Sequence, residues 1–129
     1  MGAISREALH DALKDAWSAD TSASSDWTEQ NRAKGQCAVT ACVVQDYLGG
    51  EILNTVATLP GGKTVSHYFN LIDGKNVDLT DEQFPSGTTF TEPKPKHGKY
   101  ASTRDYCLSN DHTNQRYEVL RVRVAERMR

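Results

Sequence analysis

The sequence lacks long apolar runs and any strong excess of charge of one sign. No stretch approaches the ~18 apolar residues of a membrane-spanning helix, and the first residues lack the charged segment and apolar core of a signal peptide. The 15 basic and 17 acidic residues leave a formal net charge of −2, which is too balanced for a broad nucleic-acid-binding surface. We therefore expect a cytoplasmic protein that binds neither membranes nor nucleic acid.

Cysteine and histidine are too few and too scattered for a disulfide framework or a metal centre. The three cysteines are an odd number, and the separation of Cys37 from Cys42 is not that of a CxxC redox or zinc motif. Cys107 is distant from both, and the four histidines are dispersed. Structural zinc sites bring four such ligands together. The sequence therefore predicts no metal ion and no cofactor.

Length and composition are those of an ordinary globular protein. The 129 residues predict a single domain over positions 1–129. A chain of this length buries roughly two-thirds of the surface that it exposes when unfolded, which is enough for one apolar core. The hydrophobic fraction of 37% and the charged fraction of 25% agree with this interpretation.

Apolar residues at helical spacing predict helices over 4–17 and 36–48, and a short helix over 102–109. The second of these is almost entirely small or apolar, which indicates burial on most sides. From Thr113 onward two patterns compete. Tyr117, Leu120, Val124 and Met128 have helical spacing, whereas Leu120, Val122 and Val124 alternate as in a strand. We favour a helix there.

Strands are predicted over 51–58, 64–72 and 75–80 from their β-branched and alternating residues. Asp73-Gly74 separates the last two and is typical of a two-residue hairpin loop. One helical turn is expected over 81–84, followed by a long exposed loop over 85–100. The predicted fold class is α+β, with the central helix packed on an antiparallel sheet.

Cys37 falls in the first turn of the predicted central helix. The helix dipole and the free N–H groups of a first turn stabilise a thiolate, and the same groups can bind an oxyanion formed from a carbonyl. Cys42 lies in the middle of the helix and gains neither effect, so we assign it to the core. Cys37 is therefore the candidate nucleophile.

A nucleophilic thiol needs a base, and the chain has four histidines for this role. His10 belongs to the first helix, His97 to the exposed loop and His112 to a polar turn. His67 starts a strand that we expect to pack on the central helix. It is the histidine whose position would be most rigidly fixed relative to Cys37.

The hairpin register predicts a partner for His67. A two-residue loop places Phe69 opposite Asp78 and makes His67 the diagonal neighbour of Asp78 on the same face of the sheet. Diagonal neighbours lie roughly 7–8 Å apart, within reach of polar side chains. A one-residue slip would move Asp78 to the other face. With this register, Asp78 would orient the imidazole and stabilise its charged form.

Each of the three residues also has a purely structural interpretation. Cys37 could be a small buried apolar group, His67 a hydrogen-bonded structural residue, and Asp78 the cap of the turn over 81–84. The catalytic interpretation rests on the fact that all three assignments agree with one fold.

Several segments together resemble the YunG-like family of small bacterial proteins. The resemblance covers about residues 27–124. It is carried by Gly35-Gln36-Cys37-Ala38-Val39-Thr40-Ala41, Gly49-Gly50-Glu51-Ile52-Leu53, Ser66-His67-Tyr68-Phe69-Asn70, Val77-Asp78-Leu79-Thr80-Asp81-Glu82-Gln83-Phe84, Leu108-Ser109-Asn110 and Arg116-Tyr117-Glu118-Val119-Leu120.

The order of a helix-borne cysteine, a strand-borne histidine and an aspartate on the next strand is also similar to the papain and transglutaminase-like superfamily. That resemblance implies a small papain/transglutaminase-like domain with Cys37 as nucleophile, His67 as base and Asp78 as orienting residue. Papain-type enzymes carry a glutamine six residues before the cysteine, where this chain has Asn31. Gln36 directly precedes Cys37, and either amide could complete an oxyanion hole.

The predicted function is a cysteine-dependent hydrolase, a peptidase or deamidase, that acts on a peptide or protein amide through a thioester. Trp27, Tyr68, Phe69 and the 85–100 loop would frame the substrate groove. Two alternatives stay open. The scaffold could be a protein-binding module without activity, because a fold does not dictate function. It could also be an acyl transferase, in which an amine rather than water resolves the thioester.

Overall fold

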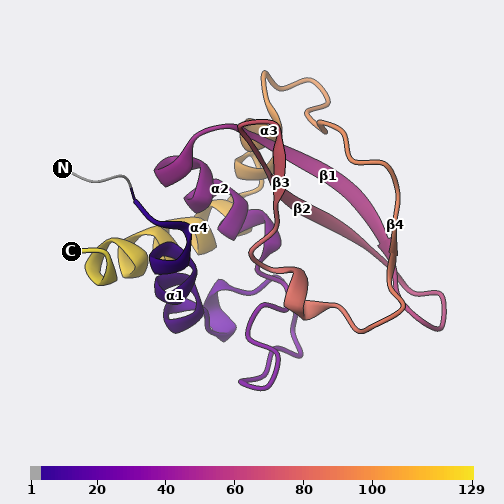
Figure 1. Ribbon diagram of the computed structural model, residues 1–129, viewed down its shortest axis with the longest axis horizontal. Coiled ribbons are helices and arrows are strands. Elements are labelled where there is room, and N and C mark those ends of the chain that lie inside the picture. The colour runs from indigo at the N-terminus through magenta and orange to yellow at the C-terminus, as the bar shows by residue number, and fades with distance from the viewer. Residues whose placement is uncertain (1–3) are drawn as a thin grey trace.

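Helices pack on one side of an antiparallel sheet in the computed structural model, which describes residues 4–129 (Figure 1). The fold class is therefore α+β, as predicted. In chain order the elements are α1 (Arg6–Ala16), η1 (Ala19–Thr21), α2 (Cys37–Leu48), β1 (Glu51–Thr58), β2 (Thr64–Ile72), β3 (Lys75–Val77), η2 (Asp81–Gln83), β4 (Thr89–Phe90), α3 (Thr103–Leu108) and α4 (Asp111–Arg127).

The described strands form one sheet in the order β3-β2-β1-β4, with antiparallel pairing throughout. Ile72 pairs with Lys75 across the loop, which confirms the predicted hairpin register. Asp73 and Gly74 have φ of 51° and 75°, the left-handed conformations that a type I′ turn requires at both central positions. Strand β3 ends at Val77, three residues earlier than predicted, because the chain turns there into η2.

Helix α2 fills the centre of the molecule. Val39 to Val44 are all buried, as their almost unbroken apolar run predicts. The helix is anchored to the sheet by Asn70, whose side-chain amide donates to the carbonyl of Ala41 at 2.9 Å. Gly50 permits the tight connection to β1, because its φ is +79° and a Cβ there would collide with the carbonyl oxygen of Leu71.

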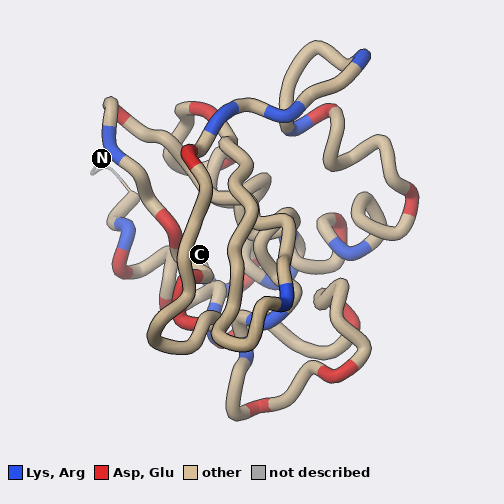
Figure 2. Tube along the Cα trace, turned by 90° about the vertical axis from the view of Figure 1, so that its right-hand side faces the viewer, with Lys and Arg blue, Asp and Glu red and all other residues tan. Residues whose placement is uncertain are grey.

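Helix α4 packs on both α1 and α2. Tyr117, Leu120 and Val124 are buried on its inner face, whereas Val122 is 46% exposed. This burial has the helical period and resolves the ambiguity of the C-terminal segment, since a strand would have buried Val122 together with its alternating neighbours. Charged positions of both signs are interspersed along the chain (Figure 2).

The segment 85–100, expected to be a simple exposed loop, also extends the sheet. Thr89 and Phe90 form β4 against Thr58 and Ala57 of β1, and the backbone of Lys94 bonds with that of Asn54 farther along the same strand. The prolines of this segment limit the pairing to short pieces, because proline has no N–H to donate. Within residues 4–129, no helix has the length and apolar character needed to cross a membrane.

Candidate active site

Cys37 is the first residue of α2 and the accessible thiol of the chain. It is half-buried, whereas Cys42 and Cys107 are buried. Burial raises the pKa of both of these thiols to about 12, so they stay protonated at neutral pH. The first intrahelical hydrogen bond runs from Thr40 N–H to the Gln36 carbonyl, so the N–H groups of the preceding turn have no acceptor within the helix. Cys37 thus lies where a negative charge is stabilised.

His67 and Asp78 form a short, partly shielded pair. The Nε2 atom of His67 lies 2.6 Å from Oδ2 of Asp78. The His67 side chain is 1% exposed and that of Asp78 is 23% exposed. The other carboxylate oxygen of Asp78 accepts hydrogen bonds from the backbone N–H and the hydroxyl of Thr80. Asp78 is therefore held in place by its own turn while it faces the imidazole.

Asp78 leaves the other ring nitrogen of His67, Nδ1, unoccupied. Nδ1 is buried and has no hydrogen-bond partner within residues 4–129. Cys37 Sγ donates instead to the carbonyl of Ser66, the neighbour of His67, at 3.9 Å. Burial by itself favours the neutral ring, but the hydrogen bond to Asp78 and the nearby sulfur of Cys37 outweigh it and raise the pKa of His67 to about 9. The imidazolium form is therefore favoured at neutral pH.

Aromatic side chains cover the imidazole. The ring of Phe84 meets it edge-on at a centroid distance of 4.8 Å, and Phe69 stacks on it at 6.0 Å. Phe90 lies 6.2 Å from the imidazole and contacts Phe84 in turn. These rings shield the His67 side of the pair from water, and an apolar surrounding strengthens the electrostatic interaction with Asp78.

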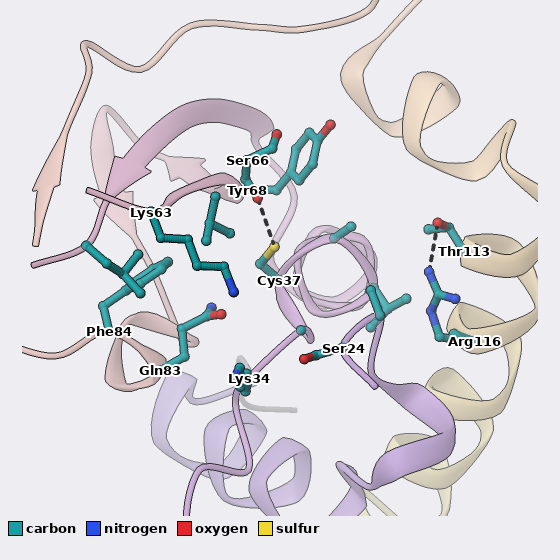
Figure 3. Close-up of a pocket in the computed structure, with 16 residues that line it drawn as sticks. Ser24, Lys34, Cys37, Lys63, Ser66, Tyr68, Gln83, Phe84, Thr113 and Arg116 are labelled. Atoms are coloured by element: carbon teal, nitrogen blue, oxygen red, sulfur yellow. Dashed lines mark hydrogen bonds between the residues drawn. The ribbon is translucent and has the colours of Figure 1, made fainter. Parts of the chain in front are cut away.

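A cavity of about 420 Å³ opens beside Cys37 (Figure 3). Ser66 and Tyr68 of β2 line it on the sheet side, and Gln83 and Phe84 line it from η2 and the turn that follows. Its volume lies within the roughly 300–1,000 Å³ of small-molecule sites. The cavity thus leaves the Cys37 side chain accessible to a small molecule.

Comparison with known proteins identifies the family. The model of the family described as YunG protein matches residues 5–129. The chain belongs to the YunG family. It is 43% identical over 94 residues to the protein of Bacillus subtilis (strain 168) described as "Uncharacterized protein YunG", an alignment that covers 72% of this chain and 76% of that protein. No solved structure matches the chain.

This member of the YunG family brings Cys37, His67 and Asp78 together, but the three further residues proposed from the sequence lie outside the cavity lining. Gln36 is fully buried and its amide donates to the Ser18 carbonyl at 3.0 Å. The Trp27 indole donates to the Arg32 carbonyl at 2.8 Å. The side-chain amide of Asn31 donates to the backbone carbonyl of Gln83 at 3.3 Å, so Asn31 contacts a residue of the cavity lining without lining the cavity itself.

Other cavity residues were not anticipated as site residues. Gln83 and Phe84 belong to a segment that carried the family resemblance, yet no pattern within it assigned them a role. Lys63 comes from the turn between β1 and β2, and Arg116 from α4. These residues are distant in sequence and meet only in the folded chain. Tyr68 lines the cavity as expected, whereas the 85–100 loop contributes Phe90 to the cover of His67.

Within the described part of the chain, no group of three or more His, Cys, Asp or Glu side chains is arranged to hold a metal ion. The groups that could react are the accessible thiol of Cys37, the buried imidazole of His67 and the carboxylate of Asp78, which contacts the imidazole through Nε2.

Proposed function

We propose that this protein is a cysteine-dependent amide hydrolase, a peptidase or deamidase. One observation carries the proposal. His67 is held by Asp78 through Nε2 at 2.6 Å, while its Nδ1 is left without a partner in residues 4–129 on a ring whose pKa the nearby Cys37 helps to raise. Nucleophile, base and orienting residue in this relation form the general arrangement for covalent acyl transfer.

The reaction would proceed in two halves. The Cys37 thiolate adds to the carbonyl carbon of the amide, and the carbonyl oxygen becomes an oxyanion. Imidazolium His67 then donates a proton from Nδ1 to the departing amine, the C–N bond breaks, and a thioester remains. In the second half neutral His67 takes a proton from water as the water attacks the thioester, which releases the acid and regenerates the thiolate.

The oxyanion would be stabilised by the start of α2. The free N–H groups of its first turn carry partial positive charge, and such donors are worth most where charge develops in the transition state. Among the described residues that line the cavity, Gln83 carries the one side-chain amide. Its Nε2 donates to the Thr80 carbonyl at 3.0 Å, which leaves a second N–H for the oxyanion.

The likeness to papain and transglutaminase-like enzymes supports the same chemistry. The cysteine begins a central helix, the histidine lies on the adjacent strand and the aspartate follows the next strand. Gln83 would take the role that a glutamine before the cysteine has in papain-type enzymes. An amine in place of water would make the protein an acyl transferase, and analysis of the products with and without added amine separates the two reactions.

Alkylation kinetics test the proposal without a known substrate. The rate of Cys37 modification by iodoacetamide would be measured by mass spectrometry from pH 5.5 to 9.5 in the native sequence and in His67→Ala. Cys42 and Cys107 serve as internal controls. We expect Cys37 to react at pH 6.5 about tenfold or more faster than a free thiol, and to lose this advantage without His67. A Cys37 that behaves like a free thiol and is indifferent to His67 would favour a binding module.

A further inference from the structure

The cavity beside Cys37 is positively charged. Lys34, Lys63 and Arg116 are the charged residues among those that line it, and no Asp or Glu of the described chain belongs to its lining. Lys34 is compensated, because its Nζ lies 2.6 Å from a carboxylate oxygen of Asp26. Lys63 and Arg116 form no ion pair within residues 4–129. Two cations thus face the cavity without a partner of opposite charge.

Arg116 differs from the other arginines of its helix. Along α4, Arg121 pairs with Glu118, Arg123 with Asp20 and Arg127 with Asp15. These three ion pairs lie at the surface, whereas Arg116 forms no ion pair within residues 4–129.

Arg116 is half-buried, donates only to the hydroxyl of Thr113 at 3.2 Å, and has a buried Nε without a partner in the described structure. Burial lowers its pKa, which reflects the cost of a desolvated charge. A partly desolvated guanidinium without a counter-charge destabilises a fold unless a ligand supplies the counter-charge.

The two free cations lie on opposite sides of the start of α2 (Figure 3). Lys63 extends toward Cys37 from the sheet side, whereas Arg116 projects from α4 on the other side of the helix. The positive end of the α2 dipole lies between them. Val39, Leu59 and Val65 add apolar walls. A ligand that fits this cavity would combine an apolar portion with a negative charge.

We propose that the substrate is an amide that carries a carboxylate, that Arg116 binds this carboxylate, and that Lys63 adds positive charge on the side of the thiol. The planar guanidinium matches a carboxylate in a bidentate geometry, which favours this anion. The inference rests on the proposed function, because it takes Cys37 as the reacting group. The carboxylate could be the free C-terminus of a peptide or the side chain of an acidic residue.

Paired affinity labels test the inference. Two of the labels are N-chloroacetyl-glycyl-glutamic acid amide and its glutamine counterpart, which differ only in that the first has a side-chain carboxylate. The third label is N-chloroacetyl-glycyl-glutamine with a free C-terminus, in which the negative charge lies at the end of the chain. We expect saturable alkylation of Cys37 and a preference of about tenfold or more for one charged label over the neutral one. The charged label that alkylates Cys37 faster identifies the source of the carboxylate.

Variants assign the preference to residues. Arg116→Gln is expected to abolish the preference and Arg116→Lys to restore part of it. Arg121→Gln removes the same charge from the solvent-facing side of α4 and is expected to leave the preference unchanged. Lys63→Gln is expected to reduce the ratio of iodoacetate to iodoacetamide reactivity, since these short reagents sample only the surroundings of the sulfur.

The outcomes separate the two proposals. Fast alkylation by charged and neutral labels alike would overturn the carboxylate inference and leave the hydrolase proposal intact. Slow alkylation by all labels, unaffected by His67→Ala, would overturn the hydrolase proposal. In that case the N-acetyl analogues would be titrated into Cys37→Ser and followed by NMR, and equal affinities for charged and neutral peptides would overturn carboxylate recognition as well.

Discussion

His67 meets Asp78 through Nε2 at 2.6 Å and leaves Nδ1 without a hydrogen-bond partner in the described structure. A buried polar atom that lacks a partner costs free energy, so natural structures retain few of them. The Cys37 sulfur donates to the carbonyl of Ser66, one residue from the imidazole. Rotation of this one side chain would give Nδ1 its partner and would create a thiolate–imidazolium pair.

Asp78→Asn is expected to slow alkylation of Cys37 at pH 6.5 by about tenfold or more while the fold stays intact. An asparagine amide can donate to Nε2, which would place the ring proton on Nδ1 and remove the charge that stabilises imidazolium. The pKa of His67, followed by NMR, should fall from about 9 toward its usual value. Asp81→Asn is the control, since Asp81 forms no hydrogen bond with the imidazole. An unchanged pKa in Asp78→Asn would contradict this account.

Protein stability should depend on the same titration. The pKa of His67 is raised in the folded state to about 9 from its usual 6.5, so the folded state binds the proton more tightly than the unfolded state does. The resulting stabilisation is fully present below pH 6.5 and is lost as the pH rises through about 9.

Urea unfolding at pH 6, 8 and 10 measures this dependence. The free energy of unfolding should fall by about 3 kcal/mol across the range in the native sequence. At pH 6, His67→Gln should be less stable than the native sequence. Its free energy of unfolding should not show the fall that comes from deprotonation of His67. Parallel pH profiles for the two proteins would show that folding does not raise the pKa of His67, and would contradict this account.

Most helices and strands, and the proximity of His67 and Asp78, were predictable where local sequence chemistry decides the structure. Asp73-Gly74 dictates a two-residue turn, the turn dictates the register, and the register brings Asp78 to the face of His67. The placement of Gln36 was not accessible in this way. Its neighbour Cys37 faces the cavity, while Gln36 turns inward to Ser18 because the loop over 18–24 packs against the start of α2. Arg116 and Lys63 meet the site only through tertiary packing.

The connection between α2 and β1 offers a test of the fold itself. Gly50→Ala is expected to destabilise the protein by about 2 kcal/mol or more, because it combines a left-handed backbone with a collision against the Leu71 carbonyl oxygen. Gly61→Ala is the matched control. Its φ is +96° and a Cβ there meets no atom of the described chain within 4 Å, so its cost reflects backbone strain alone. Thermal or urea unfolding would compare the two, and equal losses would refute the proposed collision.

Substitutions at two glutamines should distinguish an effect on oxyanion binding from an effect on protein stability. Gln83 lines the cavity, whereas Gln36 is fully buried and donates to Ser18. A peptide aldehyde forms a reversible adduct with a reactive thiol, and the oxygen of the adduct occupies the oxyanion position. Gln83→Ala is expected to weaken aldehyde binding by about tenfold, since it removes one donor to that oxygen, with little change in unfolding free energy.

Gln36→Ala should show the opposite pattern. It removes a fully buried side chain and one hydrogen bond to the Ser18 carbonyl, which keeps the backbone N–H and the hydroxyl of Thr21 as donors. The lost packing and the lost hydrogen bond are expected to cost about 1–3 kcal/mol of stability, while the aldehyde affinity of the folded protein is expected to stay the same. If Gln36→Ala instead weakened the adduct and Gln83→Ala did not, the oxyanion would be bound on the N-terminal side of Cys37, and the role proposed for Gln83 would be wrong.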